Sequence, residues 1–411
     1  MIEHQTKIAV IGLGYVGLPL ALAFAEHFQT LGFDVSEQRI EELQKGVDRT
    51  GEVDSNSLLT SKLRTTNNEN DLSACNFFIV TVPTPIDSSY KPDLRPLLNA
   101  SELVGKYLNA NDTVVYESTV YPGVTEDVCI PVLEKASKLK GKIDFSVGYS
   151  PERINPGDKV NTVKTIMKLV AGDSRESSKR IKAVYDKIID AGTFEAASIK
   201  VAECCKCLEN TQRDLNIALM NNISEICRKI GISTHDVISA AKTKWNFLPF
   251  EPGLVGGHCI GVDPYYLIHL GENLDVDVNL MKSARDVNEN IIHQINDEVV
   301  ATFGSEPIEI LICGFTFKEN CPDVRNTKVS DLIRVLQFHK HNVQVYDPVA
   351  DSPNVIKSYE DLCTKYDLII FAVKHDCFAN EFPEIAKLLA PGGKIFDLKR
   401  MFAAELSDWS L

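Results

Sequence analysis

Near its N-terminus the chain reads Lys7-Ile-Ala-Val-Ile-Gly12-Leu-Gly14-Tyr-Val-Gly17, a β-branched run that leads into three spaced glycines. An apolar pattern with helical spacing follows over Leu18–Phe28. In such a strand–turn–helix unit the first glycine allows a tight turn, the second lets a pyrophosphate approach the backbone, and the third lets the helix pack on the strand. The N-terminal end of the helix then attracts the phosphates. We therefore expect a dinucleotide to bind here, with three glycines that merely turn a loop as the alternative.

The next predicted strand, Gln29–Val35, carries an acidic residue near its end. Asp34 lies 17 residues after Gly17, where a carboxylate binds the ribose 2′-hydroxyl of NAD and repels the 2′-phosphate of NADP. The sequence therefore favours NAD. Arg39, five residues further on, is a base that suits NADP and keeps that alternative open.

Short apolar runs and helical stretches alternate after this unit. The strand-like runs are Phe77–Val82, Thr113–Val120, Phe145–Gly148 and Ile166–Ala171, and the stretches between them include Leu94–Leu108 and Glu126–Leu139. Such alternation predicts β-α units on a parallel sheet. We assign residues 1–195 to a first domain of the α/β class that binds NAD.

A long helix is predicted over Ser198–Ile230, where apolar residues recur at intervals of three and four with one gap. At 1.5 Å per residue this helix is about 45 Å long, a length that bridges domains or builds a dimer interface. Helical patterns resume at Thr234–Lys242 and Asn279–Phe303, separated by a loop rich in proline and glycine, Pro249–Pro264. Residues 196–304 therefore form a predicted central helical domain.

The alternating pattern restarts in the C-terminal part of the chain. The strand-like runs are Ile308–Cys313, Asn342–Tyr346, Leu368–Val373 and Lys394–Leu398, with helical runs at Lys328–His339 and Glu384–Leu389. The first of these strands ends in Gly314 and the second at Asp347, as the first two strands of the chain end in Gly12 and Asp34. We therefore expect a smaller domain at residues 305–411. The predicted fold has two Rossmann-like, doubly wound α/β domains joined by the long helix and a helical dimerisation region.

Composition limits the classes of function. The 411 residues carry a formal charge of −14, with 44% hydrophobic and 24% charged residues, as in an ordinary globular protein. An acidic surface repels nucleic-acid phosphates and anionic lipids, so we expect neither nucleic acid nor membrane as a partner. The uncharged stretch Ile8–Ala25 could be a signal peptide or a membrane span, but its glycines and Pro19 favour the glycine loop.

The cysteines indicate a reducing compartment. There are eleven, an odd number without regular spacing, so we expect free thiols in the cytoplasm. Cys204-x-x-Cys207 has half of a zinc spacing, but no second pair completes it, and we expect no metal.

Polar side chains follow three of the predicted strands. The segments are Val82-Pro-Thr84-Pro85-Ile86, Glu117-Ser-Thr119 and Tyr149-Ser-Pro-Glu152-Arg153-Ile-Asn-Pro-Gly157. The carboxyl ends of parallel strands meet at one edge of the sheet, where ligands bind in open α/β folds. We expect a site at this rim, although the first segment taken alone fits a proline-stiffened turn equally well.

The segment Gly256-Gly257-His258-Cys259-Ile-Gly-Val-Asp263-Pro264 is the second strong signal. Two glycines leave the thiol accessible, with an imidazole beside it and a carboxylate four residues later. A thiol in such a loop fits a nucleophile, with a plain loop thiol as the alternative. On the long helix, Lys206 and Asn210 lie at i and i+4 and share a face, although a lysine on a helix is usually a solvated charge.

Two further strand ends carry bases in this acidic chain. Lys318 and Arg325 lie in the loop after Gly314, and Lys399 and Arg400 follow the last strand. Bases at the carboxyl ends of strands suit a second phosphorylated ligand, with ordinary surface charge as the alternative.

The order of these motifs resembles the UDP-glucose/GDP-mannose dehydrogenase family. In that family a glycine triplet, Lys-x-x-x-Asn, Gly-Gly-x-Cys-x-x-x-Asp and a Phe-Lys pair with an arginine seven residues later follow one another as they do here, and the resemblance covers about residues 7–400. Four stretches are still more similar to the bacterial branch that oxidises UDP-N-acetylhexosamines and feeds capsule and surface-polysaccharide synthesis. They are Val115–Gly123, Gly148–Asp158, Trp245–Phe250 and Pro252–Tyr266.

The resemblance implies an oxidation of the sugar C6 alcohol in two steps, each of which uses one NAD⁺. Cys259 would trap the intermediate aldehyde as a thiohemiacetal and then carry a thioester, which water hydrolyses to the uronic acid. Lys206 and Asn210 would steady oxyanion charge or the hydrolytic water, and Asp263 would help to manage protons. The residues that match the family's reaction centre are Cys259, Lys206, Asn210, Asp263, Glu152 and Thr119.

The resemblance also implies the residues that bind the two ligands. For NAD they are Gly12, Gly14, Tyr15, Val16, Gly17, Asp34, Arg39, Thr84, Pro85, Thr119 and Arg325. For the UDP-sugar they are Glu152, Arg153, Lys206, Asn210, Phe250, Gly253, Gly256, Phe317, Lys318 and Lys399. A homodimer with the long helix at its core completes the expectation.

The chain departs from the family at two places. The loop before the thiol, Pro252-Gly-Leu-Val-Gly-Gly257, is one residue shorter than in many relatives, and Lys242 and Lys244 stand where a partner's arginine often contacts the substrate phosphate. Three alternatives stay open: the same chemistry on UDP-glucose or another nucleotide sugar, a nucleotide-sugar-binding protein without turnover, and an unrelated two-electron dehydrogenase.

Overall fold

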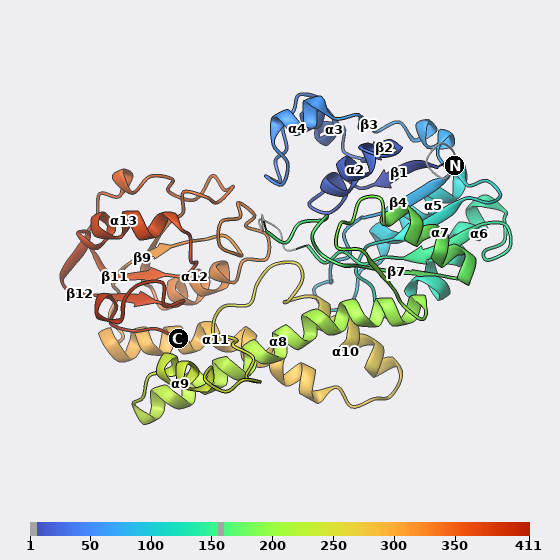
Figure 1. Ribbon diagram of the computed structural model, residues 1–411. Helices are drawn as coiled ribbons and strands as arrows, with labels where there is room; N and C mark the ends of the chain where they lie inside the picture. Colours follow the sequence, from blue (N-terminus) through green and yellow to red (C-terminus); the bar gives the residue numbers. More distant parts are fainter. Residues whose placement is uncertain (1–5, 155–159) are drawn as a thin grey trace. The chain divides into compact units, whose positions relative to one another are not determined.

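The computed structural model describes residues 6–154 and 160–411. The chain divides into two compact units, Met1–Glu209 with Tyr265–Leu274, and Asn210–Pro264 with Asp275–Leu411. Figure 1 follows the chain through both units from blue to red. Each unit contains one twisted sheet with helices on its faces, and the two are described separately below.

The first unit is built on an eight-stranded sheet of order β3-β2-β1-β4-β5-β6-β7-β8. Its strands are β1 (Lys7–Ile11), β2 (Gln29–Phe33), β3 (Arg64–Thr66), β4 (Phe77–Val80), β5 (Thr113–Tyr116), β6 (Ser146–Tyr149), β7 (Lys168–Gly172) and β8 (Thr193–Glu195). Strand β1 pairs with both β2 and β4, so the strand order reverses at β1. This reversal is the place where doubly wound sheets open a crevice for a ligand.

Both faces of this sheet are buried. Along β1, Ile8 and Val10 pack into one hydrophobic cluster, whereas Ala9 and Ile11 pack into another on the opposite face. Alternation of this kind follows from the two-residue period of a strand. Because both faces need apolar side chains, the strand reads as a continuous apolar run in the sequence.

Helices cover the two faces of the sheet. They are α2 (Gly17–Ala25), α3 (Glu37–Gln44), α4 (Ser55–Thr60), α5 (Arg95–Tyr107), α6 (Ile130–Ser137) and α7 (Arg175–Tyr185), with a 3₁₀ helix at η1 (Glu69–Ala74) and a π-helix at η2 (Val124–Cys129). The sequence predicted α2, α5 and α6 with shifted ends, but it did not predict α3, α4 or α7.

One strand pair differs from the predicted all-parallel sheet. Strand β7 runs antiparallel to β6, with Gly148 opposite Gly172 and Tyr149 opposite Ala171. The other neighbours in this sheet are parallel. The expectation of a purely parallel sheet was therefore wrong at β6–β7, and the reversal carries the start of β7 to the edge where β5 and β6 end.

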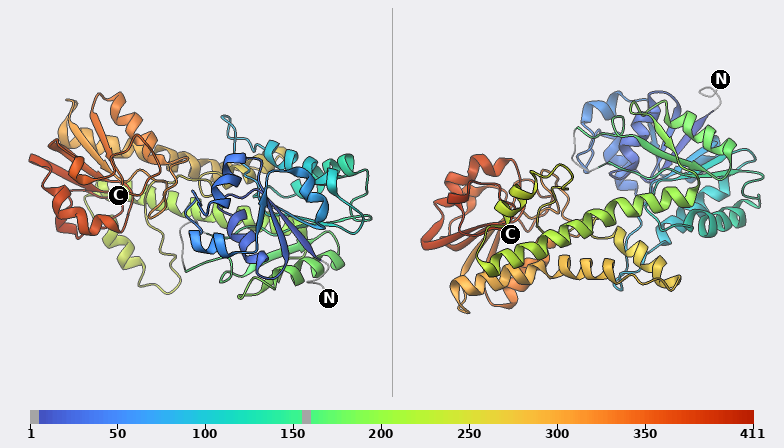
Figure 2. Two further views of the ribbon diagram at one scale, coloured as in Figure 1. Left: turned by 90° about the horizontal axis from the view of Figure 1, so that it is seen from above. Right: turned by 60° about the horizontal axis from the view of Figure 1, so that its bottom comes forward.

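The long helix α8 spans Ile199–Ile230, as the sequence predicted within one residue. The division between the two units falls inside this helix, after Glu209. Its C-terminal half lies beside α11 (Asn279–Phe303), as Figures 1 and 2 show. Asn221 of α8 donates to Asn288 of α11 at 2.8 Å.

The second unit contains a four-stranded parallel sheet of order β10-β9-β11-β12. Its strands are β9 (Glu309–Cys313), β10 (Asn342–Tyr346), β11 (Tyr366–Phe371) and β12 (Leu389–Asp397). Its other elements are α9 (Thr234–Ala241), α12 (Lys328–Phe338), α13 (Cys377–Ala386), η3 (Tyr359–Asp361) and η4 (Ala404–Leu406), and α10 (Asp263–Asn273) begins in this unit. The molecule therefore has the predicted architecture of two Rossmann-like sheets and a long central helix.

Two predicted boundaries were wrong in this part of the chain. The helix expected at Glu384–Leu389 is α13, which starts at Cys377, while Leu389 begins strand β12. The loop expected to end at Pro264 gives way to α10 one residue earlier, at Asp263. In both places the helix starts in a stretch where apolar and polar residues are mixed, so the spacing of apolar residues does not mark its first residue.

Two global expectations concern the cysteines and the membrane. All eleven cysteines lie in the described residues and are free thiols, as expected. Within residues 6–154 and 160–411, no helix combines the length and the apolar character needed to cross a lipid bilayer.

Candidate active site

The glycine loop of the first unit has the geometry that its spacing predicted. Gly12 has φ = +97°, a conformation that side chains disfavour. A Cβ at Gly17 would lie 1.8 Å from the Gly12 carbonyl oxygen, whereas a Cβ at Gly14 would meet no atom within 4 Å. Gly17 thus lets α2 pack on β1, and Gly14 leaves open space beside the turn.

The start of α2 provides a favourable environment for phosphate. Val16 occupies the N-cap position without a side-chain capping hydrogen bond, and the first turn contains no acidic residue. The partial positive charge of this helix end is therefore not offset by a neighbouring carboxylate. The loop fits a pyrophosphate, and Tyr15 lies between Gly14 and Val16 within it.

Asp34 follows β2 and turns toward the same loop. Its Oδ2 accepts a hydrogen bond from the Leu13 N–H at 2.9 Å, and its Oδ1 accepts one from the Ser36 N–H at 2.9 Å. These two bonds fix the carboxylate at the end of β2 beside Gly12–Gly14. A carboxylate in this position matches the one that binds an NAD ribose, so the described residues fit this dinucleotide.

Arg39 is placed differently from a surface base. Its guanidinium is buried, donates from Nε to the Leu13 carbonyl at 2.9 Å and pairs through Nη2 with Asp48 at 2.8 Å. Nη1 is buried and has no hydrogen-bond partner among the described residues. Arg39 therefore stabilises the glycine loop from inside the protein, and its Nη1 group keeps its hydrogen-bond donors unused within the part of the chain that the structure describes. It does not present an exposed charge to a 2′-phosphate.

The segments after β4 and β5 lie side by side at this edge of the sheet. Thr84 donates from Oγ1 to the Thr119 carbonyl at 2.7 Å, which brings two of the predicted NAD contacts together. Tyr266 donates from its hydroxyl to the Thr84 carbonyl at 2.7 Å. Pro85, the next residue, is exposed.

Glu152 follows β6 at the same edge. Its Oε2 pairs with the Nζ of Lys168 at 2.7 Å, and the same ammonium pairs with Glu117 after β5 at 2.6 Å. Arg153 turns away to Glu209 of α8 and donates from Nη1 to the Met167 carbonyl at 2.9 Å. The sequence predicted Glu152 and Arg153 as site residues but did not single out Lys168. The rest of that motif, Asn155–Gly157, lies outside the described residues.

Helix α8 carries two of the predicted residues one turn apart. Lys206 is buried in the first unit, and Asn210 begins the part of the helix that belongs to the second. Asn210 donates from Nδ2 to Asp263 Oδ2 at 2.5 Å. Asp263 itself is buried at the start of α10.

Cys259 is exposed, whereas Gly253, Val255 and Gly257 of the same loop are buried. The Asp263 N–H donates to the Cys259 carbonyl at 2.8 Å, so the carboxylate and the thiol residue are linked through one turn of backbone. The structure therefore places three predicted catalytic residues, Cys259, Asp263 and Asn210, in one connected group. An accessible thiol in such a setting is suited to covalent chemistry.

The glycines before Cys259 allow this loop to touch the strand ends of the second unit. If Gly253 carried a Cβ, that atom would lie 2.2 Å from Lys399 Nζ. A Cβ at Gly256 would lie 2.7 Å from the Asn326 carbonyl oxygen, and one at Gly257 would lie 2.5 Å from the Phe317 ring. The loop therefore lies directly against Phe317 and Lys399, both of which were predicted to bind the sugar nucleotide. Burial lowers the pKa of Lys399.

A polar contact from α8 anchors the loop. Asn221 accepts from the Gly253 N–H at 2.8 Å and donates to the Gly253 carbonyl at 3.1 Å. Asn288 of α11 donates in turn to Asp214 at 2.8 Å. This buried network was not predicted, because an asparagine within a helix gives no signal in the sequence that distinguishes it from a solvated one.

Arg325 lies beside the loop but is already paired. It binds Asp323 through Nε and Nη2, at 3.0 Å and 2.7 Å, and His258 Nε2 lies 3.1 Å from the same carboxylate. Although burial alone would raise the pKa of Asp323, its hydrogen bonds with His258 and Arg325 lower it well below its usual range. Arg325 is thus an exposed base held next to the residue before Cys259. Phe250 and Lys318 are partly buried in the same unit.

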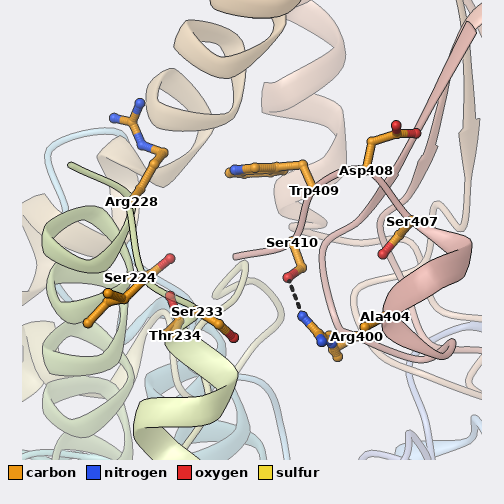
Figure 3. Close-up of a pocket in the computed structure, with 11 residues that line it drawn as sticks. Ser224, Arg228, Ser233, Thr234, Arg400, Ala404, Ser407, Asp408, Trp409 and Ser410 are labelled. Atoms are coloured by element: carbon orange, nitrogen blue, oxygen red, sulfur yellow. Dashed lines mark hydrogen bonds between the residues drawn. The ribbon is translucent and has the colours of Figure 1, made fainter. Parts of the chain in front are cut away.

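A cavity of about 300 Å³ lies elsewhere in the second unit. Ser224 and Arg228 of α8, the start of α9 and the segment 400–410 line it, and Figure 3 shows Trp409 reaching into it beside a hydrogen bond between Arg400 and Ser410. None of the predicted NAD- or sugar-binding residues lines this cavity, so it is separate from the groups described above.

Comparisons with known proteins agree with this geometry. Profiles of the UDP-glucose/GDP-mannose dehydrogenase family match residues 6–189 with the NAD binding domain, 200–290 with the central domain and 311–404 with the UDP binding domain. A UDP-N-acetyl-D-glucosamine 6-dehydrogenase from Pseudomonas aeruginosa is 48% identical over 98% of this chain and 99% of its own length. Protein CapL from Staphylococcus aureus is 47% identical over 96% of this chain and 95% of its own length.

The fold has solved counterparts. A UDP-D-ManNAc dehydrogenase from Pyrococcus horikoshii superimposes with a TM-score of 0.89 at 29% identity, covering 97% of this chain and 96% of that one. Sequence and fold thus lead to the same assignment across nearly the whole length. The chain belongs to the UDP-glucose/GDP-mannose dehydrogenase family and is an NAD-dependent oxidoreductase.

Proposed function

We propose that this protein oxidises the C6 alcohol of a UDP-N-acetylhexosamine, UDP-N-acetylglucosamine or UDP-N-acetylgalactosamine, to the uronic acid. The observation that carries the proposal is the exposed thiol of Cys259 in a loop that is packed on Phe317 and Lys399 and joined to Asp263. The P. aeruginosa relative, named for oxidation at C6 of UDP-N-acetyl-D-glucosamine, supports this choice of substrate. As the resemblance in the sequence implies, the product would supply anionic surface polysaccharides.

The proposed reaction balances as one alcohol, two NAD⁺ and one water giving one carboxylate, two NADH and three protons. The Gly12–Gly17 loop and Asp34 would hold NAD⁺, which would supply hydride acceptance for each of the two oxidations at the sugar carbon. Between them, the thiolate of Cys259 adds to the aldehyde carbon and gives a thiohemiacetal, and the second oxidation leaves a thioester. Water then attacks the thioester, and the carbon–sulfur bond breaks to release the uronate and the thiolate.

The remaining catalytic residues act on protons and developing charge in this proposal. Lys206 and Asn210 stabilise the oxyanion of the thiohemiacetal, with Asn210 oriented by its 2.5 Å bond to Asp263. Asp263 takes up the proton of the thiol or of the alcohol. Glu152 accepts a hydrogen bond from the hydrolytic water, and Thr119 lies at the same strand edge as Glu152.

The binding roles follow the two units. In the first, the Gly12–Gly17 loop, Asp34 and the strand ends at Thr84 and Thr119 bind NAD, while Arg39 supports the loop. In the second, the UDP moiety binds to the strand ends near Phe317 and Lys399. We propose that the three predicted domains, residues 1–195, 196–304 and 305–411, are the functional divisions of the chain.

We also propose that the protein is a homodimer built on α8. Leu219, Ile226 and Ile230 are 52%, 54% and 64% exposed and lie seven and four residues apart. This spacing puts them on one side of the helix, where an apolar stripe normally faces another protein surface. Val201 and Leu208 continue the same spacing toward the N-terminus of α8 and are also exposed.

A panel of substrates tests the proposed activity. NADH formation is followed with UDP-N-acetylglucosamine, UDP-N-acetylgalactosamine, UDP-glucose and GDP-mannose, and the highest kcat/KM is expected for one of the two acetamido sugars. A clear preference for UDP-glucose would move the assignment to that sugar. Binding of all four without NADH formation would support a nucleotide-sugar-binding protein instead.

A further inference from the structure

A buried cluster of charges lies behind Glu152. Lys168 Nζ is 2.7 Å from Glu152 Oε2 and 2.6 Å from Glu117 Oε2. The side chains of Lys168 and Glu117 are 3% and 0% exposed, whereas that of Glu152 is 11% exposed. Of these three described side chains, that of Glu152 is therefore the most exposed.

Strand direction explains why these three residues meet. Glu117 and Glu152 follow the parallel strands β5 and β6, so both lie at the carboxyl edge of the sheet. Strand β7 is antiparallel to β6, and the observed register, continued beyond Tyr149–Ala171, puts Lys168 opposite Glu152. In a parallel β7 the first residue of the strand would lie at the other edge.

Both oxygens of the Glu152 carboxylate are held. While Oε2 binds Lys168, Oε1 accepts from the N–H groups of Arg153 and Ile154 at 2.7 Å and 2.6 Å. Glu117 binds Lys168 through Oε2 and accepts through Oε1 from the hydroxyl of Tyr185 on α7. Each member of the cluster thus has a fixed partner, and rotation of the Glu152 carboxylate would break at least one of these bonds.

The charges reinforce this arrangement. Burial alone would raise the pKa of Glu152, but Lys168 and the two backbone N–H groups outweigh it and lower that pKa. Burial raises the pKa of Glu117 to about 7. Among residues 6–154 and 160–411, the titratable groups in contact with Lys168 are Glu117 after β5, Glu152 after β6 and Tyr185 on α7. The Arg153 guanidinium is bound to Glu209 instead.

We propose that Lys168 and Glu117 are positioning residues, which hold the Glu152 carboxylate in one orientation and keep it available as an acceptor at the reaction centre. Lys168 acts directly on Glu152, and Glu117 with Tyr185 keeps the ammonium in place. This inference rests on the proposed function, because it assigns Glu152 its task there. It adds Lys168, which none of the sequence motifs includes, and gives a role to Glu117 of the Glu117-Ser-Thr119 segment.

Kinetics as a function of pH provide the first test. In Lys168→Met, kcat should fall about a hundredfold because Glu152 is no longer oriented, while KM for NAD stays within about twofold. The acid limb of the kcat profile should also move to higher pH, because a buried carboxylate without its cation takes up a proton more easily. Lys168→Arg keeps the charge and should recover most of the activity.

Glu117→Gln is the matched comparison, since it also removes one charge from the cluster. It retains an acceptor for Lys168, so kcat should fall by no more than about tenfold, and the acid limb should not move upward. Lys182→Met removes a partly exposed lysine on α7 that pairs with Asp186, just after the helix, and is the control for loss of an ordinary ion pair. Equal effects of Lys168→Met and Glu117→Gln on kcat and on the acid limb would overturn the proposal and leave only a structural role.

A second readout does not need turnover. Carbon-13 NMR of labelled glutamate carboxyls follows the ionisation of Glu152 and Glu117, assigned with Glu152→Gln and Glu117→Gln. In the wild-type protein the pKa of Glu152 should lie below its ordinary value and Glu117 should titrate near pH 7, and Lys168→Met should raise the pKa of Glu152. A wild-type Glu152 whose pKa lies above the ordinary glutamate value would contradict the inference, whereas failure of every sugar to react would contradict only the proposed function.

Discussion

At the scale of single residues, Cys259 distinguishes the candidate functions most clearly. It is one of three exposed cysteines, with Cys204 and Cys363, but it alone of the three lies in the glycine loop beside Asp263. A protein that only binds a nucleotide sugar has no need of a thiol there, and a two-electron dehydrogenase needs no covalent trap. The role of Cys259 is therefore the most informative single-residue prediction.

Replacing Cys259 by serine should lower the rate of uronic acid formation at least about a thousandfold, while NAD and the UDP-sugar still bind. The reason is that a serine hydroxyl is a poorer nucleophile at neutral pH and a poorer leaving group from an ester. Product is measured by chromatography, and binding by calorimetry. Cys363→Ser, at an exposed thiol outside the loop, should behave as wild type, and uronic acid formation at the wild-type rate in Cys259→Ser would end the covalent proposal.

The residue scale also shows where prediction from sequence succeeds. The roles of Gly12 and Gly17 were predictable because local backbone geometry requires glycine there, and Asp34 lies beside their loop as its place after the second strand implied. Arg39 was predicted as an NAD contact, but its burial was not, and Lys168 was not singled out, since a basic residue in a sequence does not reveal whether its charge is buried. Only the contacts with Asp48 and with two glutamates show that these bases act inside the protein.

At the scale of elements, α8 connects parts of the chain through buried polar contacts. Its Glu203 accepts from the Gly123 N–H at 2.6 Å and the Thr125 N–H at 2.9 Å, which ties α8 to the segment after β5. Burial raises the pKa of Glu203 to about 7. The folded protein therefore binds a proton at this site that the unfolded chain releases at lower pH.

Glu203 should make stability fall as pH rises. Its folded pKa of about 7 exceeds the usual value near 4.5, so the cost of ionising it in the fold grows between about pH 4.5 and 7 and reaches on the order of 3 kcal/mol above that. Glu203→Gln lacks this cost, and its Tm relative to wild type should rise from pH 5 to pH 8 by several degrees, at about 2–4 °C per kcal/mol. Thermal unfolding at both pH values measures this, with the exposed Glu26→Gln as control. A Tm difference that does not change with pH would contradict it.

The apolar stripe on α8 leads to a prediction about assembly. Ile226→Asp puts a charge into the proposed dimer contact, so the variant should sediment as a monomer at concentrations where the wild type is a dimer, because a buried unpaired charge costs several kcal/mol. Arg213→Ala changes the net charge by the same amount on another side of the helix and should leave the dimer intact. A wild-type monomer, or a dimeric Ile226→Asp variant, would argue against this interface.

Elements differed in how well the sequence predicted them. The helix α11 and the strand β10 have the predicted ends, because their apolar periodicity starts and stops sharply. The direction of β7 was missed, since the residues of a strand buried on both faces look alike whether it is parallel or antiparallel. The antiparallel direction of β7 brings Lys168 to Glu152. Because this direction was not predicted, the contact between Lys168 and Glu152 was not predicted either.

At the scale of the whole molecule, the two sheets repeat one local design with different outcomes. Gly314 has φ = +95° after β9, as Gly12 has +97° after β1, and Asp347 accepts from the Phe315 N–H at 2.6 Å, as Asp34 does from Leu13. Asp347, however, is fully buried and also contacts His375 at 3.1 Å, whereas Asp34 is partly exposed. The second aspartate therefore supports its own loop, which agrees with an NAD site in the first unit only.

A four-electron oxidation fixes the ratio of NADH formed to UDP-N-acetylglucosamine consumed, and this ratio is the decisive measurement. Absorbance gives the NADH formed, and mass spectrometry identifies the sugar product in the same reaction. We expect two NADH for each sugar consumed, with the uronic acid as the product. One NADH for each sugar, with the aldehyde as the product, would contradict it.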